Sequence, residues 1–186
     1  MTTMCHRYAH AVLALALLGG AACSGDDATA RRRASYPGAK AVDVARIEFD
    51  DGDTFLLDGK PIRFLGIDTP EVAGPDVGIF EDQPFGRAAA DSTRALILRA
   101  RVVEIATDGL DRYQRRLAHI FVDGELLAEK LLAMGLAYEN VSHFGDNGFP
   151  DLADRILRAA DAGPKPPFEP PHKWRKKHQR KTATKP

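Results

Sequence analysis

The feature that most constrains the fold of this chain is a short apolar run that stops at a proline, within residues 62–71. Apolar residues bounded by turn formers are typical of a buried strand. Pro70 ends that strand, because proline donates no hydrogen bond to a β-ladder and keeps the residue before it out of helical geometry. Arg63 therefore lies on the strand, while Asp68 and Glu71 flank its end. Charges in this place suit a functional site better than a core, although a hairpin strand with solvated charges would give the same pattern.

The rest of the pattern predicts a small barrel. Strands are expected at residues 42–49, 54–57, 61–67, 101–107 and 116–122, and helices at residues 87–99, 126–134 and 152–160. Asp58 and Gly59 form a strong hairpin signal between the second and third strands, whereas Asp108 and Gly109 are expected to begin a turn after the fourth. Residues 136–144 are expected to be extended. This order fits an α+β fold, a five-stranded closed β-barrel of the OB type with about three α-helices, and such barrels bind oligonucleotides on one face.

The first residues, 1–22, have the layout of a secretory signal peptide. Their apolar run, residues 11–18, is too short to span a bilayer and is followed by small residues that end at Cys23. This ending resembles a bacterial lipoprotein signal, in which Cys23 would be acylated and become the mature N-terminus, and the alternative is ordinary cleavage and free secretion. We therefore expect export, as a cell-envelope lipoprotein or as a secreted or periplasmic protein, with residues 23–41 as a flexible tether. Cleavage would also remove Cys5, so a mature monomer would have no internal disulfide and no cysteine zinc site.

Charge is divided unevenly between the body of the chain and its C-terminal end. Residues 38–164 contain 14 Lys and Arg against 23 Asp and Glu, a net charge of −9, whereas residues 165–186 contain eight against one, a net charge of +7. The end of the chain, residues 164–186, is rich first in proline and then in basic residues, so we expect it to be disordered. An acidic body with a basic tail indicates that the tail, rather than the body, meets polyanions at a distance.

Three charged motifs follow one another along the predicted domain. Residues 51–54 come after the first strand, Arg63 and residues 68–71 come from the third, and residues 111–115 precede the fifth. Each motif alone would be an ordinary turn or a solvated surface. Together, in this order and spacing, they resemble the thermonuclease family, the staphylococcal-nuclease-like domains, over residues 42–163. The resemblance implies an OB-fold barrel that hydrolyses phosphodiester bonds of DNA and RNA with calcium.

The same resemblance implies a metal site and a general base. Asp53 and Asp68 match the calcium-binding carboxylates of the family, and Thr69 matches a residue that supplies a backbone carbonyl. Glu71 matches the residue that activates the attacking water. The chemistry agrees, because calcium is a hard cation that prefers oxygen ligands and a carboxylate near it stays ionised and can accept a proton.

The resemblance also implies which residues hold the substrate. Arg63 and Arg115 match the two catalytic arginines that bind the scissile phosphate, and a planar guanidinium suits this role because it donates two parallel hydrogen bonds. Arg112 and Tyr113 fall where the family places a basic and an aromatic residue near the nucleotide. We interpret His119, in the predicted fifth strand, as a buried and satisfied barrel histidine rather than a catalytic one.

Two functions from different classes remain open at this point. The first is a calcium-dependent endonuclease of the cell envelope, and the second is a non-catalytic OB-fold module that binds nucleic acid there. A module that has lost turnover is expected to lack at least one of Arg63, Glu71 and Arg115, and the chain retains all three, which favours the enzyme. The expected partners are DNA and RNA as substrates and a membrane, through a lipid anchor at Cys23, and the chain is expected to be a monomer.

Overall fold

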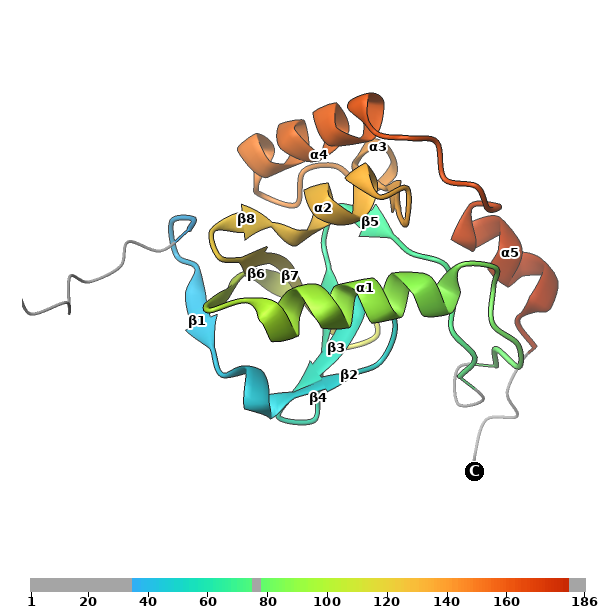
Figure 1. Cartoon of the computed structure of the whole chain (residues 1–186), viewed down its shortest axis with the longest axis horizontal. Helices are drawn as coiled ribbons and strands as arrows, with labels where there is room; N and C mark the ends of the chain where they lie inside the picture. Colours follow the sequence, from blue (N-terminus) through green and yellow to red (C-terminus); the bar gives the residue numbers. More distant parts are fainter. Residues whose placement is uncertain (1–34, 75–77, 181–186) are drawn as a thin grey trace, which may run out of the picture. The chain divides into compact units, whose positions relative to one another are not determined.

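A seven-stranded sheet curls around the core of the domain (Figure 1). The computed structural model describes residues 35–74 and 78–180, so the predicted signal peptide and Cys23 lie outside the described residues. The strands of this sheet are β1 (Lys40–Val42), β2 (Ile47–Phe49), β3 (Thr54–Leu57), β4 (Lys60–Phe64), β6 (Val103–Leu110), β7 (Arg116–Val122) and β8 (Glu125–Leu126). Their spatial order is β1-β6-β7-β4-β3-β2, with β8 on β7. Strands β4 and β7 run parallel, and the other neighbours run antiparallel.

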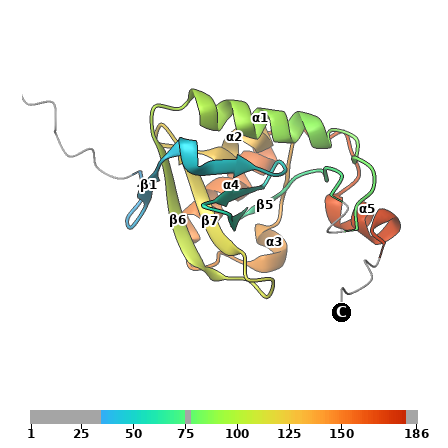
Figure 2. The same ribbon diagram turned by 90° about the horizontal axis from the view of Figure 1, so that it is seen from below.

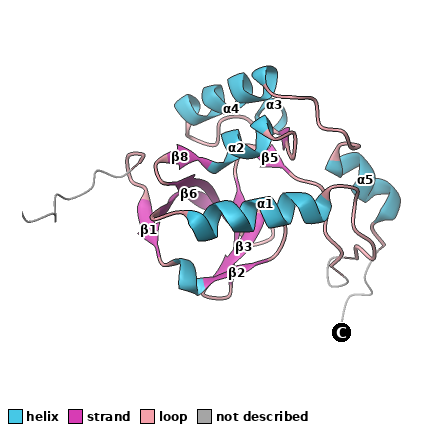
Figure 3. Ribbon diagram, viewed as in Figure 1, coloured by secondary structure: helices cyan, strands magenta, loops and turns pink. Residues whose placement is uncertain are grey.

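Helices cover the sheet from several sides. They are η1 (Val44–Arg46, a 3-10 turn), α1 (Gly86–Arg99), α2 (Leu127–Ala133), α3 (Val141–Phe144), α4 (Pro150–Ala162) and α5 (Pro171–His178). Figure 3 shows α2, α3 and α4 gathered on one side of the sheet, with α1 on another. Helix α5 lies apart from them, beside the loop that leads into α1 (Figures 1 and 2). No described helix has the length and apolar content that a membrane span needs.

These elements confirm the predicted α+β fold of the OB type. The Asp58–Gly59 hairpin is present and joins β3 to β4, with φ angles of 53° and 71° that match a two-residue turn. One core fills the curl of the sheet, and its fully buried side chains include Phe55, Phe121 and Ile156. The sheet differs from a closed barrel, because β1 and β2 are its two edges and do not pair with each other within the described residues. The helices also number five rather than about three in the part of the chain that is described.

The strand predicted over residues 61–67 breaks at Gly66. The chain leaves the large sheet after Phe64 and continues as β5 (Ile67–Asp68), which pairs with β9 (Tyr138–Glu139). Gly66 has a φ of +83°, and a Cβ placed there would lie 2.3 Å from Cδ1 of Ile156. Only glycine combines this backbone conformation with such a close approach of α4. The break therefore turns Asp68 off the sheet, toward the strand ends that carry the other predicted site residues.

Three further elements differ from the sequence prediction. The strand expected at residues 42–49 is divided by η1, whose first turn is capped when the amide of Ala45 donates to Oδ1 of Asp43 at 2.9 Å. Residues 108–109 do not begin a turn but continue β6, where the register shifts between Thr107 and Leu110. Residues 141–144, expected to be extended, form α3. In each case the local sequence signal indicated a different backbone conformation from the one that the structure has.

The C-terminal end differs most. Residues 164–186 are predicted to be disordered, yet residues 171–178 form α5. Pro171 suits the first turn of a helix, where its missing N–H is not needed. Trp174 is only 5% exposed, and Phe168 just before the helix is 8% exposed. Two large apolar side chains thus anchor a segment whose overall composition is polar and basic. We refer to residues 168–180 as the C-terminal arm.

Candidate active site

Arg63 stands at the centre of the predicted site. Its guanidinium, on β4, forms ion pairs with Asp53 and with Asp68, the second at 2.9 Å between Nη2 and Oδ1. It also donates to the backbone carbonyls of Asp53 at 3.3 Å and Ile67 at 3.2 Å. Two carboxylates that lie 15 positions apart in the chain are therefore held on one cation. The structure brings together the turn before β3 and the strand end after β4, as the sequence predicts.

Asp53 is tied to Thr69 as well as to Arg63. Its Oδ2 accepts the amide hydrogen of Thr69 at 2.7 Å, and both residues are buried. The turn can lie this close because residue 52 is glycine: a Cβ on Gly52 would be 2.7 Å from Oγ1 of Thr69. The hydroxyl of Thr93, on α1, fixes the same turn by donating to the carbonyl of Gly52 at 2.7 Å. The hydroxyl Oγ1 of Thr69 is itself buried and has no hydrogen-bond partner among the described residues.

Asp51 is a third acidic residue of this cluster, which the sequence prediction did not assign to the site. Its Oδ1 accepts the amide hydrogen of Asp53 at 2.9 Å. Burial raises the pKa of Asp51, and the charges of Arg63 and, less strongly, Arg115 oppose the rise. The pKa of Arg63 is lowered, first by its own burial and further by the neighbouring cations Arg115 and Arg175. The charge of Arg115 thus acts on both Asp51 and Arg63, so Arg115 is within electrostatic reach of this cluster.

The second arginine lies on the loop before β7. Oδ2 of Asp111 accepts from Nε of Arg115 at 2.8 Å, while its Oδ1 accepts the amide hydrogens of Tyr113 and Arg115 at 2.8 and 2.9 Å. The Tyr113 ring is 63% exposed. The guanidinium carbons of Arg112 and Arg115 lie 4.7 and 5.5 Å from its centre. The loop thus presents an exposed aromatic ring with two cations against it.

Glu71 lies on the segment that follows Pro70, and its backbone is fixed on both sides. Oε1 of Gln83 accepts the amide hydrogen of Glu71 at 3.2 Å, and the carbonyl of Glu71 accepts the amide hydrogen of Gln83 at 2.9 Å. A Cβ on Gly86 would lie 2.1 Å from that same carbonyl, so the start of α1 touches it directly. Burial raises the pKa of Glu71, and the nearby charge of Arg175 opposes the rise. Gln83 is a buried positioning residue that no sequence pattern singled out.

Arg175 of α5 completes the cluster and was not expected there. Its guanidinium donates to both oxygens of Asp68, at 3.3 Å to Oδ1 and 3.1 Å to Oδ2, and to Oε1 of Glu71. Burial acts to lower the pKa of Arg175, but the two carboxylates outweigh burial and the net pKa is raised. One sequence signal could have pointed to this residue, namely the large apolar Trp174 beside it in an otherwise basic stretch.

Comparison with known proteins places this arrangement in a family. The family model described as staphylococcal nuclease homologue matches residues 61–159, more than half of the chain. The chain belongs to this family. The predicted family resemblance is therefore confirmed, and the matched span includes Arg63, Asp68, Glu71 and Arg115 but neither Asp53 nor α5.

Curated relatives agree with the family assignment. The chain is 38% identical over 92 residues to a thermonuclease of Staphylococcus hyicus, a match that covers 47% of this chain and 53% of the relative. It is 35% identical over 92 residues to a thermonuclease of Staphylococcus intermedius, with the same coverage. It is 36% identical over 104 residues to endonuclease YncB of Bacillus subtilis, covering 53% of this chain and 48% of the relative. The chain thus spans about half the length of the curated relatives it matches.

The donor atoms of the site suit a hard divalent cation. Asp53, Asp68 and Glu71 offer carboxylate oxygens and Thr69 offers a backbone carbonyl, which are ligands that calcium prefers. Within residues 35–74 and 78–180, no group of three acidic, histidine or cysteine side chains is already arranged around one metal position. Guanidinium groups stand among these carboxylates instead. The chemistry of the donors fits a hard divalent cation, while the carboxylates are now paired with arginines.

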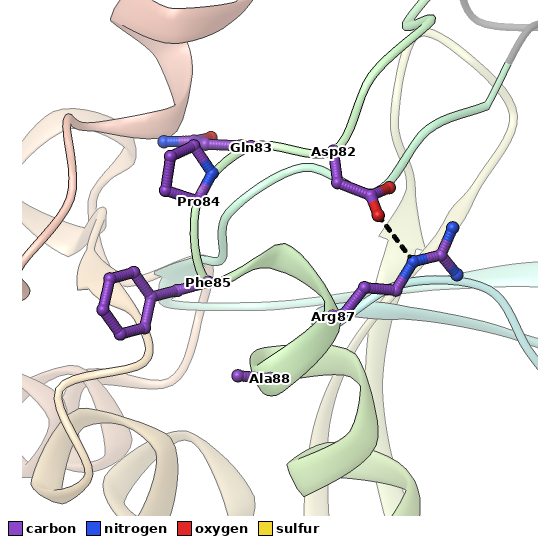
Figure 4. Close-up of a pocket in the computed structure, with 6 residues that line it drawn as sticks. All are labelled: Asp82, Gln83, Pro84, Phe85, Arg87 and Ala88. Atoms are coloured by element: carbon purple, nitrogen blue, oxygen red, sulfur yellow. Dashed lines mark hydrogen bonds and ion pairs between the residues drawn. The ribbon is translucent and has the colours of Figure 1, made fainter.

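A pocket at the start of α1 borders the site. It is lined by Asp82, Gln83, Pro84, Phe85, Arg87 and Ala88. Figure 4 shows the Asp82–Arg87 ion pair on one side of this pocket and the Gln83 and Phe85 side chains on the other. Nε2 of Gln83 donates to the carbonyl of Glu169 at 2.6 Å, so this side chain joins the C-terminal arm to the Glu71 segment. The wall of the pocket is therefore part of the support of Glu71.

Proposed function

We propose that this protein is a calcium-dependent endonuclease that hydrolyses phosphodiester bonds of DNA and RNA. The observation that carries the proposal is the pairing of Asp53 and Asp68 with Arg63, with Glu71 joined to Asp68 through Arg175 and with Arg115 in electrostatic reach of Arg63. Relatives named thermonuclease and endonuclease support it. Nucleic acid is the class of substrate that such a site suits, because it presents phosphodiester groups to arginines and carboxylates together.

Arg63 and Arg115 are proposed to bind the scissile phosphate. Within the described residues, the only side chain that accepts from the Arg115 guanidinium is Asp111, through Nε. This bond orients the fork and leaves the Nη atoms for phosphate oxygens. Arg63 is more buried than Arg115 and is paired with two carboxylates. Because it is shielded from water, its interaction with a bound phosphate would be screened only weakly.

Glu71 is proposed to take the proton from the attacking water. A general base works best when its pKa lies near the working pH, and burial moves the pKa of Glu71 upward from the usual carboxylate range. The hydrogen bonds of its backbone to Gln83 hold the carboxylate at a fixed place relative to Asp68. When bound by Asp53, Asp68 and the Thr69 carbonyl, calcium would supply positive charge that offsets the charge growing on the phosphate.

Arg112 and Tyr113 are proposed to contact the nucleotide next to the scissile bond. The Tyr113 ring is exposed and lies close to two guanidinium groups. An exposed aromatic ring can stack on a base of any sequence, and such stacking contributes about 1–3 kcal/mol per base. The loop would thereby favour single-stranded or frayed ends, whose bases are free to stack.

The test is hydrolysis of a labelled oligonucleotide across a calcium titration, with a chelator as the zero point. Glu71→Gln keeps the size of the side chain and removes the base, so turnover is expected to fall by about 10²–10⁴-fold. Arg115→Lys keeps the charge and loses the planar fork, so it is expected to be a poor substitute. Glu48→Gln and Arg101→Lys, at exposed positions, are the matched controls. If both site variants cut as fast as the parent, the roles proposed for Glu71 and Arg115 are wrong. If the parent binds the oligonucleotide but does not cut it at any calcium concentration, the non-catalytic nucleic-acid-binding module is the better description.

We also propose export and a lipid anchor at Cys23. The support comes from the sequence alone, from the apolar run of residues 11–18 and the small residues before the cysteine. Mass spectrometry of the mature N-terminus is expected to find an acylated Cys23, and fractionation is expected to find the protein with membranes. An unmodified terminus at another residue, with the protein wholly in the soluble fraction, would rule the anchor out.

A further inference from the structure

The Arg175 guanidinium contacts two carboxylates of the proposed site, the metal ligand Asp68 and the general base Glu71. It contacts both oxygens of Asp68 and one oxygen of Glu71. Arg175 is separated from Asp68 by 107 positions and from Glu71 by 104, so the contact is a product of the fold and not of local sequence. All three side chains are mostly shielded from water, with exposed fractions of 32% for Arg175, 10% for Asp68 and 14% for Glu71. Shielded opposite charges interact far more strongly than the same pair in water.

The C-terminal arm docks through contacts that do not involve Arg175. The hydroxyl of Tyr138 donates to the carbonyl of Phe168 at 2.8 Å, and their rings meet edge to face with centres 5.5 Å apart. The amide of Arg180 donates to the carbonyl of Gly78 at 2.9 Å. Trp174 is buried and stacks on His178 with ring centres 4.2 Å apart. The arm is thus held before, within and after α5, and Arg175 is carried to the carboxylates by a built support.

Gln83 connects this arm to the proposed general base. One end of its side-chain amide accepts from the backbone of Glu71, and the other end donates to the carbonyl of Glu169. A shift of the arm is therefore transmitted to the Glu71 segment through a single buried side chain. Figures 1 and 2 agree in placing α5 beside this loop.

We propose that Arg175 is an internal cation that competes with the divalent metal for Asp68 and Glu71, and that metal binding displaces it and loosens the C-terminal arm. This rests on the proposed function only in taking Asp68 as a metal ligand and Glu71 as the general base beside the metal. A guanidinium brings one positive charge to the pair and a divalent cation brings two, so sufficient metal wins the carboxylates. In the metal-free protein, Arg175 pairs with both carboxylates and offsets part of their negative charge.

Competition of this kind is reciprocal. If metal binding weakens the Arg175 contact by some factor, then removal of Arg175 strengthens metal binding by the same factor. Couplings between sites in one protein are typically about 5–150-fold, which sets the size of the expected effect. The chain also carries its own reporter, since Trp174 is its single tryptophan and adjoins Arg175.

The experiment uses the full mature chain without nucleic acid, with calcium as the ligand. Isothermal titration is expected to show that Arg175→Gln binds calcium about 5–150-fold more tightly than the parent. Lys176→Gln, which removes the same charge at an exposed position one residue further on, is expected to change the affinity by less than about twofold. In the parent, calcium is expected to change the emission of Trp174 and to speed trypsin cleavage within α5, along the same titration curve as binding.

Arg175→Lys is the second variant, in case the glutamine variant disturbs docking of the arm. Lysine keeps one charge but not the fork, so its calcium affinity is expected to lie between those of the parent and Arg175→Gln. Equal or weaker calcium binding by both variants would overturn the competition, as would unchanged Trp174 emission in a parent that binds calcium. Absence of calcium binding in all variants would overturn it too. A parent that shows the competition but cuts no nucleic acid would refute the nuclease function alone.

Discussion

The buried histidine His119 is expected to make the folded protein sensitive to acid. It lies on β7, only 3% exposed, and its ring meets that of Phe149 edge to face with centres 5.0 Å apart. Burial, with a smaller effect from the charge of Arg155, lowers the pKa of His119 from 6.5 to about 4. Its Nδ1 has no hydrogen-bond partner among the described residues, so the prediction of a satisfied histidine holds for burial but not for this atom.

The direction of this pH effect on stability depends on whether the folded or the unfolded chain takes up the proton first as the pH falls. As the pH falls below 6.5, His119 takes up a proton in the unfolded chain but stays neutral in the folded one. The folded state is therefore fully favoured above pH 6.5 and loses stability as the pH falls toward 4. Each pKa unit corresponds to about 1.36 kcal/mol, so the total loss from this residue is about 3 kcal/mol. That is a large part of the 5–15 kcal/mol by which a typical domain is stable.

Urea unfolding between pH 7.5 and pH 4 measures this loss. His119→Gln is neutral at every pH, so its free energy of unfolding should fall by about 3 kcal/mol less than that of the parent over the same range. Carboxylates titrate in both proteins and cancel in the comparison. His143→Gln, at an exposed position, serves as the control and should follow the parent. Parallel pH curves for the parent and His119→Gln would refute the inference of a buried neutral histidine.

Two further predictions concern how the site is positioned. Asp111→Asn should lower kcat/KM in the oligonucleotide assay by about tenfold, because a lost charge-assisted bond to Arg115 costs about 1.5 kcal/mol or more. The control Asp108→Asn, at an exposed position, should leave kcat/KM unchanged. Gly66→Ala should destabilise the protein by at least about 2 kcal/mol in urea unfolding, because a Cβ there combines positive φ with a clash against Ile156. Gly109→Ala, with positive φ but open space around the Cβ, should cost only the backbone part.

Local signals predicted the parts of this fold that depend on near neighbours. The Asp58–Gly59 hairpin follows from two residues that adopt positive φ, and α1 follows from a run of good helix formers. The break at Gly66 could not be predicted in the same way, because it depends on the approach of Ile156 from a helix 90 positions later. The charged residues flanking Pro70 were placed correctly near one another, since a strand end fixes them whether or not the strand is continuous.

The prediction from composition that the C-terminal arm is disordered was wrong for a physical reason. Disorder is expected where a segment cannot bury enough apolar surface to offset its conformational entropy. Averaged over the stretch, the basic residues hide the fact that Phe168 and Trp174 are both buried. Each large aromatic side chain can bury about 150–250 Å² of surface, so two of them stabilise a short helix on an existing domain. The role of Gln83 could likewise not be predicted, because its side chain joins Glu71, 12 positions before it, to Glu169, 86 positions after it.

The division of charge along the chain acquires a different meaning from these contacts. The sequence suggested an acidic body and a basic tail that acts on distant polyanions. In the structure, part of the tail's charge pairs with the body through Arg175, which contacts Asp68 and Glu71, whereas Lys177 pairs within the tail with Glu169 at 2.6 Å. Carboxylates gathered out of water are costly unless cations join them. Arg63 pairs with Asp53 and Asp68, but no described contact joins it to Glu71. A charged Glu71 therefore needs a second cation, because its side chain is mostly shielded from water. The basic tail supplies this cation as Arg175.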